Sequence, residues 1–309
     1  MSVDLETFQS LPTTDVARLV RATGPKVCVF PINGTRRWFV LEHWDAREGD
    51  FSAPYLDVIA GRHIELYKLL FDHGVDTLLT PTFGPDIMER GKDYVQMAVE
   101  GLSRLATHAD FLAFYQDYDV RVRFYGDYRK FLDPTPYAYV SGLFDEAMER
   151  TAANNRYRLF LGLFAHDATE TIANLAVRYH AEHGRVPDKH TLVELYYGEY
   201  VEPVDMFIGF DKFCAFDMPL VAMGNEDLYF TVSPSPYLTQ HQLRGILYDH
   251  LYNRRGGEPD YTLMQPDDWA LMKDFYRANS ERTLGVGAKQ KRGGFWYPLP
   301  QVELPAGFA

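Results

Sequence analysis

Two adjacent arginines, Arg36 and Arg37, follow a short polar turn near the start of the chain. Asn33 and Gly34 form a pair typical of turns, and the backbone N–H groups of Gly34 and Thr35 are expected to be unpaired where a helix begins. Such N–H groups and the helix dipole favour an anion, and guanidinium groups have the fork geometry that suits phosphate oxygens. The pattern indicates a phosphate or diphosphate site. These residues leave one alternative open, two surface arginines after an ordinary turn.

The segment that must position this turn is Val27 to Phe30, a β-branched and aromatic run that ends at Pro31. A short apolar run followed by turn residues predicts a buried strand. The polar turn then follows the carboxyl end of that strand, where open α/β sheets bind their ligands.

Further strands and helices are expected to alternate along the rest of the chain. Alternation of this kind predicts an α/β fold with a mainly parallel central sheet flanked by helices. Without a linker-like break, residues 1–309 are expected to form one domain, with a polar loop over 42–52 and an extended tail from about residue 285. Strands are predicted over 75–80 (ending before Pro81), 120–125, 157–164, 205–208 and 228–231, and helices over 14–22, 54–73, 86–107, 111–118, 142–151, 168–183, 189–197, 239–252 and 266–278.

Composition and charge exclude several classes of function. A net charge of −12 argues against nucleic acid as a partner, because binding it requires a basic surface. The two cysteines, Cys28 and Cys214, are too few for a disulfide framework or a zinc site. Because no signal peptide or long apolar span is recognisable, the protein is expected to be cytoplasmic, without stable membrane insertion. The aromatic content of 15% predicts either an aromatic core or a pocket for a large apolar ligand or a carbocation.

The residues from Pro31 to Trp38 read Pro-Ile-Asn-Gly-Thr-Arg-Arg-Trp. They resemble the Asp-Gly-Asn-x-Arg-Trp loop that opens cis-prenyltransferases and holds their allylic diphosphate. The match is closer to an offshoot of that superfamily, the tuberculosinol/isotuberculosinol and kolavelool synthases. Further blocks resemble this group in the same order along the chain, at residues 120–127, 196–200, 205–210, 228–232 and 243–250.

This resemblance implies a cis-prenyltransferase (undecaprenyl diphosphate synthase)-like fold, Mg²⁺ as cofactor and a homodimer. It implies a diterpene synthase that ionises a bicyclic C20 prenyl diphosphate of the halimadienyl/tuberculosinyl or kolavenyl type. Diphosphate would leave, and water would quench the allylic cation to a diterpene alcohol. Two alternatives stay open: transfer to a nucleoside or other small acceptor, and a non-catalytic partner subunit. Chain elongation is not expected, because residues 208–216 lack the arginine pair that holds an acceptor diphosphate in elongating relatives.

The resemblance also assigns roles to individual residues. It implies catalytic roles for Asn33, Arg36, Arg37 and Tyr55, and substrate binding by Gly34, Thr35, Trp38, Phe83, Arg90 and Arg244. Alternatives remain for three of them: Tyr55 as a packing residue, Arg90 as a surface partner of Asp86, and Arg244 as the partner of an acidic neighbour.

Asn33 departs from the family, which has an aspartate there that helps to hold Mg²⁺. An amide is a neutral and weaker ligand for this ion. A rearranged metal site, weak metal dependence and an inactivating substitution all stay open.

Two further groups of residues have both a functional and a structural interpretation. His166, Asp167 and Glu170 could form an acid/base cluster, but a helix cap by Asp167 is the preferred interpretation. Residues 239–252 carry a wide apolar stripe that could form a dimer interface, with Tyr196 to Tyr200 as the facing surface. Burial of that stripe against the sheet is the alternative.

Overall fold

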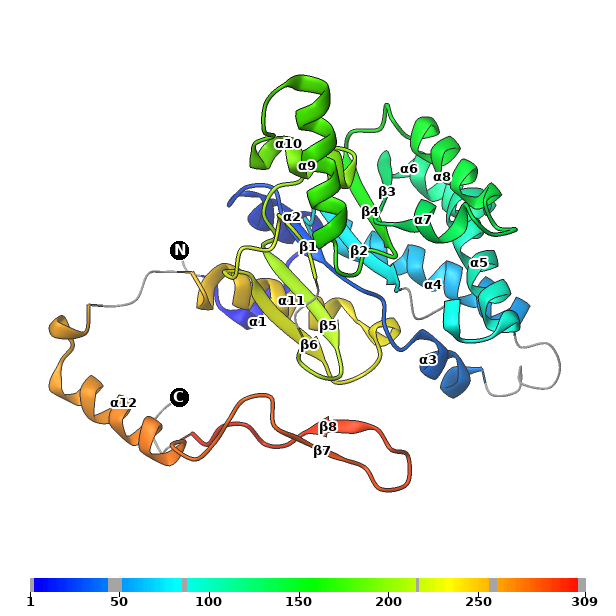
Figure 1. Cartoon of the computed structure of the whole chain (residues 1–309). Helices are drawn as coiled ribbons and strands as arrows, with labels where there is room; N and C mark the ends of the chain where they lie inside the picture. Colours follow the sequence, from blue (N-terminus) through cyan, green and yellow to red (C-terminus); the bar gives the residue numbers. More distant parts are fainter. Residues whose placement is uncertain (1–2, 44–51, 85–87, 215–216, 256–259, 305–309) are drawn as a thin grey trace.

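The computed structural model describes residues 3–43, 52–84, 88–214, 217–255 and 260–304. Its central strands are β1 (Val27–Val29), β2 (Thr77–Phe83), β3 (Val120–Tyr125), β4 (Tyr157–Leu163), β5 (Met206–Phe210) and β6 (Asp227–Thr231). They form one sheet in the order β3-β4-β2-β1-β5-β6, and every neighbouring pair is parallel. The predicted parallel α/β sheet is confirmed (Figure 1).

Helices connect each pair of consecutive strands from β1 to β5, as the crossovers of a parallel sheet require, and further helices precede β1 and follow β6. They are α1 (Leu5–Ser10), α2 (Thr13–Arg21), α3 (Thr35–Glu42), α4 (Ser52–Asp72), α5 (Lys92–Thr107), α6 (Ala109–Asp117), α7 (Tyr128–Leu132), α8 (Tyr139–Arg150), α9 (Thr169–His183), α10 (Lys189–Tyr197), α11 (Gln240–Tyr248) and α12 (Pro266–Ala278). In the described part of the chain, no helix is long and apolar enough to cross a membrane.

The sheet separates two cores. Side chains alternate between the faces of a strand, so Cys28 and Leu78 join a large core with α4, α5, α6 and α8. Val29 and Leu79 point the other way, into a smaller core with α10. Both faces of β1 are therefore buried, and the turn after Val29 is anchored from two sides.

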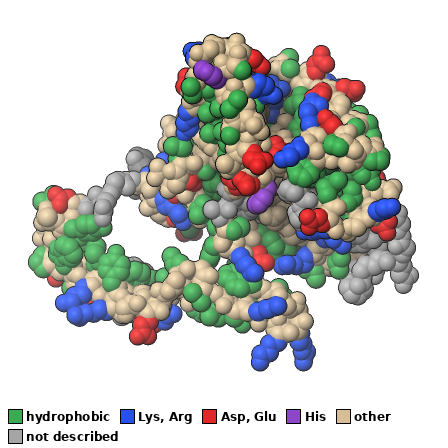
Figure 2. Space-filling view, viewed as in Figure 1, with side chains coloured by type: hydrophobic (Ala, Val, Ile, Leu, Met, Phe, Trp, Pro, Cys, Tyr) green, Lys and Arg blue, Asp and Glu red, His purple; other side chains and the backbone are tan. Residues whose placement is uncertain are grey.

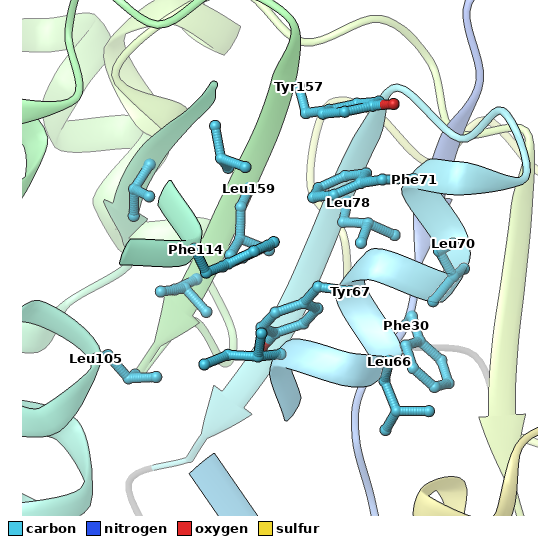
Figure 3. Packing of buried hydrophobic residues seen from close by; sticks show 14 of the residues in the cluster. Phe30, Leu66, Tyr67, Leu70, Phe71, Leu78, Leu105, Phe114, Tyr157 and Leu159 are labelled. Carbon is cyan, nitrogen blue, oxygen red and sulfur yellow. The ribbon is translucent and has the colours of Figure 1, made fainter. Parts of the chain in front are cut away.

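Much of the aromatic content lies in the larger core (Figure 3). Phe71 of α4 stacks on Tyr157 of β4 with ring centroids 4.4 Å apart, and Phe114 of α6 stacks on Phe71 at 6.3 Å. Burying one such side chain contributes about 1.5–3 kcal/mol. These aromatic contacts fix α4 and α6 against the sheet.

Several element boundaries differ from those predicted. β2 continues through Pro81 to Phe83, because β1 pairs with it only as far as Leu79 and no strand on that side needs the missing N–H. α5 begins at Lys92 rather than at residue 86, and residues 85–87 lie outside the described chain. The short helix α1 was not predicted, and the loop expected over 42–52 lies mostly outside the described residues.

The C-terminal segment is not simply extended. Strands β7 (Gly287–Lys289) and β8 (Trp296–Pro298) form an antiparallel hairpin. Together with α12 this hairpin makes an arm, residues 260–304, beside the main body (Figure 1). The arm rests on the body where Trp296 meets Phe213, with ring centroids 6.3 Å apart. α12 has no buried residue, and hydrophobic side chains lie along the arm (Figure 2).

Candidate functional site

The turn after β1 is fixed by Gly34 and Ser235. Gly34 is the N-cap of α3 with φ of 77°, and a Cβ there would lie 2.8 Å from Phe210 and 2.9 Å from Pro234. Only glycine fits both the left-handed backbone and this close approach. The Asn33 N–H donates to Ser235 Oγ at 3.1 Å, and the Ser235 N–H donates to the Asn33 carbonyl at 3.0 Å. Glycine has no side chain to cap α3, so the first turn presents its N–H groups to an anion.

A cavity of about 490 Å³ opens at this helix start. Its volume lies within the range of roughly 300–1,000 Å³ usual for small-molecule pockets. Polar and cationic residues line it at Asn33, Gly34, Thr35, Arg36, Arg37, Arg90, Tyr94 and Arg104, and apolar residues at Leu56, Ile59, Ala60, Phe83, Met97, Ala98, Leu105 and Phe111. The lining of α5 from Tyr94 to Leu105 extends over about 16 Å at 1.5 Å per residue. Such a cavity suits an elongated amphiphile with an anionic head.

Three arginines surround the anion-binding turn. The Arg36 guanidinium lies over the Tyr94 ring at 5.4 Å, and that of Arg90 lies over the same ring at 5.3 Å. Arg37 lies over Phe210 at 5.3 Å, and its guanidinium is 3.8 Å from the carboxylate of Asp211. The structure thus brings together three of the four arginines that the sequence suggested.

Tyr55 also reaches the turn. Its hydroxyl forms a 2.8 Å hydrogen bond with Thr35 Oγ1, and the Phe39 ring meets it edge-on at 5.5 Å. Burial raises the pKa of Tyr55, although Arg36 and the Thr35 hydrogen bond lower it. The phenol is therefore neutral at physiological pH and is held beside the turn.

Phe83 lines the cavity, but two other predicted site residues do not. Trp38 packs edge-on against His43 at 5.5 Å and lines a separate groove. Arg244 is buried elsewhere, where it donates to the carbonyls of Gln9 at 2.6 Å and Leu11 at 2.7 Å. The expectation that Arg244 faces the site is wrong, and so is the alternative of an acidic partner, because its role is to join α11 to the N-terminal helices.

The proposed acid/base cluster does not form at the cavity. Glu170 is an exposed partner of Lys130 at 3.9 Å, and Asp167 accepts from the Thr169 hydroxyl at 2.9 Å. Asp167 is not the helix cap that was expected, because α9 begins after Ala168 and Asp167 has φ of 51°. Asp86, the suggested partner of Arg90, lies outside the described residues.

The stripe on α11 is already occupied within the chain. Leu243, Leu247 and Leu251 are buried, and so are Tyr196 and Tyr197 on α10. The stripe therefore packs inside the fold, as the alternative interpretation had it, and Tyr196 and Tyr197 are buried as well. Neither offers the exposed surface that a dimer interface would need.

Three residues of the site gave no signal in the sequence. Ser235 comes 202 residues after Asn33 in the turn that it fixes, and Tyr94 is one tyrosine among 21. His63 lines the cavity from α4, where its Nε2 is buried without a hydrogen-bond partner among the described residues. Burial lowers the pKa of His63 to about 4, so its imidazole is neutral.

The described residues that line the cavity offer no carboxylate to a Mg²⁺ ion. Among the described residues no group of three or more His, Cys, Asp or Glu could hold a metal ion, and the described lining of the cavity contains four arginines and no carboxylate. Mg²⁺ in proteins is usually held by one or two carboxylates together with substrate phosphates. Asn33, the residue at the family's metal position, contributes only a neutral amide.

No protein-family model matches the chain. It is 42% identical over 292 residues to the tuberculosinyl adenosine transferase of Mycobacterium tuberculosis, across 94% of this chain and 96% of that protein. It is 24% identical over 286 residues to the (+)-kolavelool synthase of Herpetosiphon aurantiacus, across 90% of this chain and 91% of that protein.

Two solved structures share the fold. Lavandulyl diphosphate synthase from Lavandula x intermedia, in complex with dimethylallyl diphosphate, superposes with a TM-score of 0.60 at 17% identity, covering 79% of this chain and all (100%) of that one. A probable undecaprenyl diphosphate synthase from Campylobacter jejuni gives a TM-score of 0.55 at 17% identity, covering 75% and 98%. The predicted cis-prenyltransferase-like fold is confirmed.

Proposed function

The chain belongs to the cis-prenyltransferase-like family that includes tuberculosinyl adenosine transferase, and from this premise we propose that it transfers a diterpenyl group from a C20 diphosphate to a nucleoside. Its relatives and structural neighbours are enzymes of prenyl diphosphate chemistry. The cavity carries the proposal, because it combines a cationic helix start with a long apolar wall. Those two parts match the head and the hydrocarbon body of such a substrate.

The chemistry begins with loss of the diphosphate. The bond between the allylic carbon and the oxygen breaks, both electrons leave with the diphosphate, and an allylic cation remains. Arg36, Arg37 and Arg90, with the first-turn N–H groups of α3, would stabilise the negative charge on the departing group. An acceptor nitrogen or oxygen then bonds to the cation and loses a proton to solvent or to a nearby base.

The apolar wall has a second task, since it excludes water from a reactive cation. Phe83 and Phe111 line the wall, and aromatic faces attract a cation through their quadrupole. Tyr55 is placed where its phenol could orient the head group or the incoming acceptor. These residues favour controlled capture of the cation over random hydrolysis.

Quenching by water is the second candidate. The sequence favoured this reaction, and the 24% identity to (+)-kolavelool synthase supports it. Transfer to adenosine is the preferred candidate because the relative with 42% identity is a tuberculosinyl adenosine transferase. Mg²⁺ was expected as cofactor from the family, but the described side chains provide no carboxylate for it at the cavity, so we assign it no ligand from this chain.

We also propose a homodimer, with a different interface from the one suggested by the sequence. β6 is an edge strand; Leu228 within it is 43% exposed, and Val232 directly after it is 71% exposed. The arm docks next to this edge at Phe213, which is itself half exposed. An exposed apolar sheet edge is prone to association, and twofold symmetry would place this patch on both subunits.

Release of pyrophosphate from bicyclic C20 diphosphates, measured with and without adenosine, tests the proposed function. We expect release that depends on the C20 substrate and a product that contains the nucleoside. Adenosine-independent release with a diterpene alcohol as product would favour the second candidate. Binding without any release would leave the non-catalytic partner subunit as the remaining interpretation.

A further inference from the structure

The C-terminal hairpin segment, residues 283–302, differs in charge from the rest of the protein. The sequence carries a net charge of −12, but this segment contains three cations and neither Asp nor Glu. The cations are Lys289, Lys291 and Arg292, which are exposed and lie at or beside the turn between β7 and β8. Lys and Arg side chains are visible at the tip of the arm in Figure 2. The hairpin segment is therefore a local positive patch on an acidic protein.

The same segment exposes large apolar side chains. Trp296 faces the body, where it meets Phe213, and because side chains alternate between the faces of a strand, Tyr297 points away from the body. Phe295 and Tyr297 are 48% and 40% exposed. Four more apolar side chains of the segment are exposed: Leu284, Val286, Leu299 and Val302. Aromatic and cationic groups side by side are typical of protein segments that lie in the interface between a membrane and water.

The hairpin segment lies at the edge of the sheet that carries the candidate site. Directly after β5, Asp211 comes within 3.8 Å of Arg37, which is half exposed and lines the cavity. Two residues later, Phe213 contacts Trp296 of the hairpin. Figure 1 shows the arm facing the carboxyl ends of β5 and β6. A surface that bound the hairpin segment would therefore lie close to the entrance of the cavity.

We propose that the hairpin segment docks on an anionic lipid surface, from which the C20 diphosphate passes into the cavity. The delivery step rests on the proposed function, because it takes the substrate to be a prenyl diphosphate, whereas the docking step does not. The charges of the two surfaces are complementary, and each Lys or Arg near an anionic bilayer strengthens binding by about fivefold. The acidic body does not cancel this attraction, because charges act only over about 8 Å at physiological ionic strength.

A bilayer also accounts for the apolar part of the segment. A partner that offered negative charge alone would leave Phe295 and Tyr297 in water, whereas the headgroup region of a bilayer accepts aromatic rings and cations together. A C20 diphosphate combines an anionic head with a long hydrocarbon body, so it resides in the same interface. Docking there shortens the path of the substrate to the turn after β1.

The test is flotation of the full chain with vesicles of phosphatidylcholine, either pure or in an equimolar mixture with phosphatidylglycerol, at about 0.15 M salt. We expect the wild-type protein to bind the mixed vesicles roughly a hundredfold more tightly than the pure ones, from three cations at about fivefold each. The triple variant Lys289→Ala, Lys291→Ala, Arg292→Ala should lose this preference and keep the wild-type thermal unfolding. The double variant Phe295→Ser, Tyr297→Ser should weaken binding to both kinds of vesicle.

A second triple variant is the matched control. Arg178→Ala, Arg185→Ala, Lys189→Ala removes the same charge from exposed positions on or between α9 and α10, at the opposite end of the molecule from the hairpin (Figure 1). Its vesicle binding should equal that of the wild type. Pyrophosphate release from a C20 diphosphate carried in mixed vesicles should fall at least about tenfold in the hairpin triple variant, whereas release from the same substrate dispersed in detergent should not change.

Several outcomes would overturn the proposal. They are a wild-type protein that binds neither kind of vesicle, a hairpin triple variant that floats as well as the wild type, and equal release by both proteins from vesicle-borne substrate. A hairpin triple variant that loses a wild-type dimer mass in light scattering, when the wild type binds no vesicles, would assign the segment to a second copy of the chain and would also overturn it. Vesicle binding without turnover of any C20 diphosphate would refute the proposed function and leave the docking step standing. Turnover without vesicle binding would do the reverse.

Discussion

Gly34→Ala tests whether the turn after β1 forms the anion site. Gly34 has φ of 77°, and an added Cβ would lie 2.8 Å from Phe210 and 2.9 Å from Pro234. A left-handed backbone costs a residue with a side chain roughly 1–2 kcal/mol, and overpacking costs roughly 1–3 kcal/mol. The turn should relieve this strain by moving away from Phe210 and carrying Arg36 and Arg37 with it.

The expected loss follows from those terms. The two costs sum to roughly 2–5 kcal/mol. One part lowers folding stability, and the other part distorts the turn and weakens transition-state binding. At least about 1.4 kcal/mol is expected to fall on transition-state binding, which corresponds to about tenfold in rate. We therefore expect kcat/KM to fall by about tenfold to a thousandfold. Pyrophosphate release from a C20 diphosphate measures the first effect, and thermal unfolding measures the second.

Gly142→Ala is the matched control. Gly142 lies inside α8, and a Cβ there would meet nothing within 4 Å. Alanine in a helix interior is better than glycine by about 1 kcal/mol, so this variant should be slightly stabilised and fully active. The reasoning is refuted if Gly34→Ala keeps wild-type kcat/KM while remaining folded, because the turn would then not need its observed shape.

Four further predictions concern other parts of the account. Arg37→Ala should lower kcat/KM by about tenfold to a hundredfold, the value of one charge-assisted hydrogen bond to phosphate, and pyrophosphate release measures it. Tyr55→Phe should lower kcat/KM by about fivefold, because one neutral hydrogen bond is lost. In the wild-type protein the pKa of Tyr55 is raised, so ionisation of this phenol should cause no loss of activity below about pH 10. Arg244→Ala should destabilise the fold by about 3 kcal/mol, because two partly buried carbonyls lose their charged donor. Chemical denaturation measures this loss, and pyrophosphate affinity should persist in the folded protein. Light scattering should give a dimer mass at micromolar concentration, and a monomer mass with full activity would contradict the proposed assembly.

Much of the sheet could be predicted from the sequence because β1, β4 and β5 are almost entirely buried. Such strands are short apolar runs bounded by turn residues, and these runs can be recognised without tertiary information. β2 was cut short at Pro81 because the rule against proline in strands holds only where the neighbouring strand needs its N–H. The C-terminal hairpin was missed because its strands have three residues each.

Only part of the candidate site could be predicted from the sequence. Arg36 and Arg37 adjoin the turn in the sequence, so local reasoning found them. Tyr94 and Ser235 reach the turn through tertiary contacts alone, and a single sequence carries no trace of such contacts. Arg244 was wrongly assigned to the site, because its carbonyl partners, Gln9 and Leu11, are more than 230 residues away in the sequence and are known only from the structure.

The most direct test of the account is the fate of a bicyclic C20 diphosphate incubated with the protein and adenosine in ¹⁸O-labelled water, followed by mass spectrometry of the products. The account predicts free pyrophosphate and a diterpenyl adenosine that contains no ¹⁸O from the solvent. Recovery of the C20 diphosphate intact, under conditions in which the protein binds pyrophosphate, would contradict it.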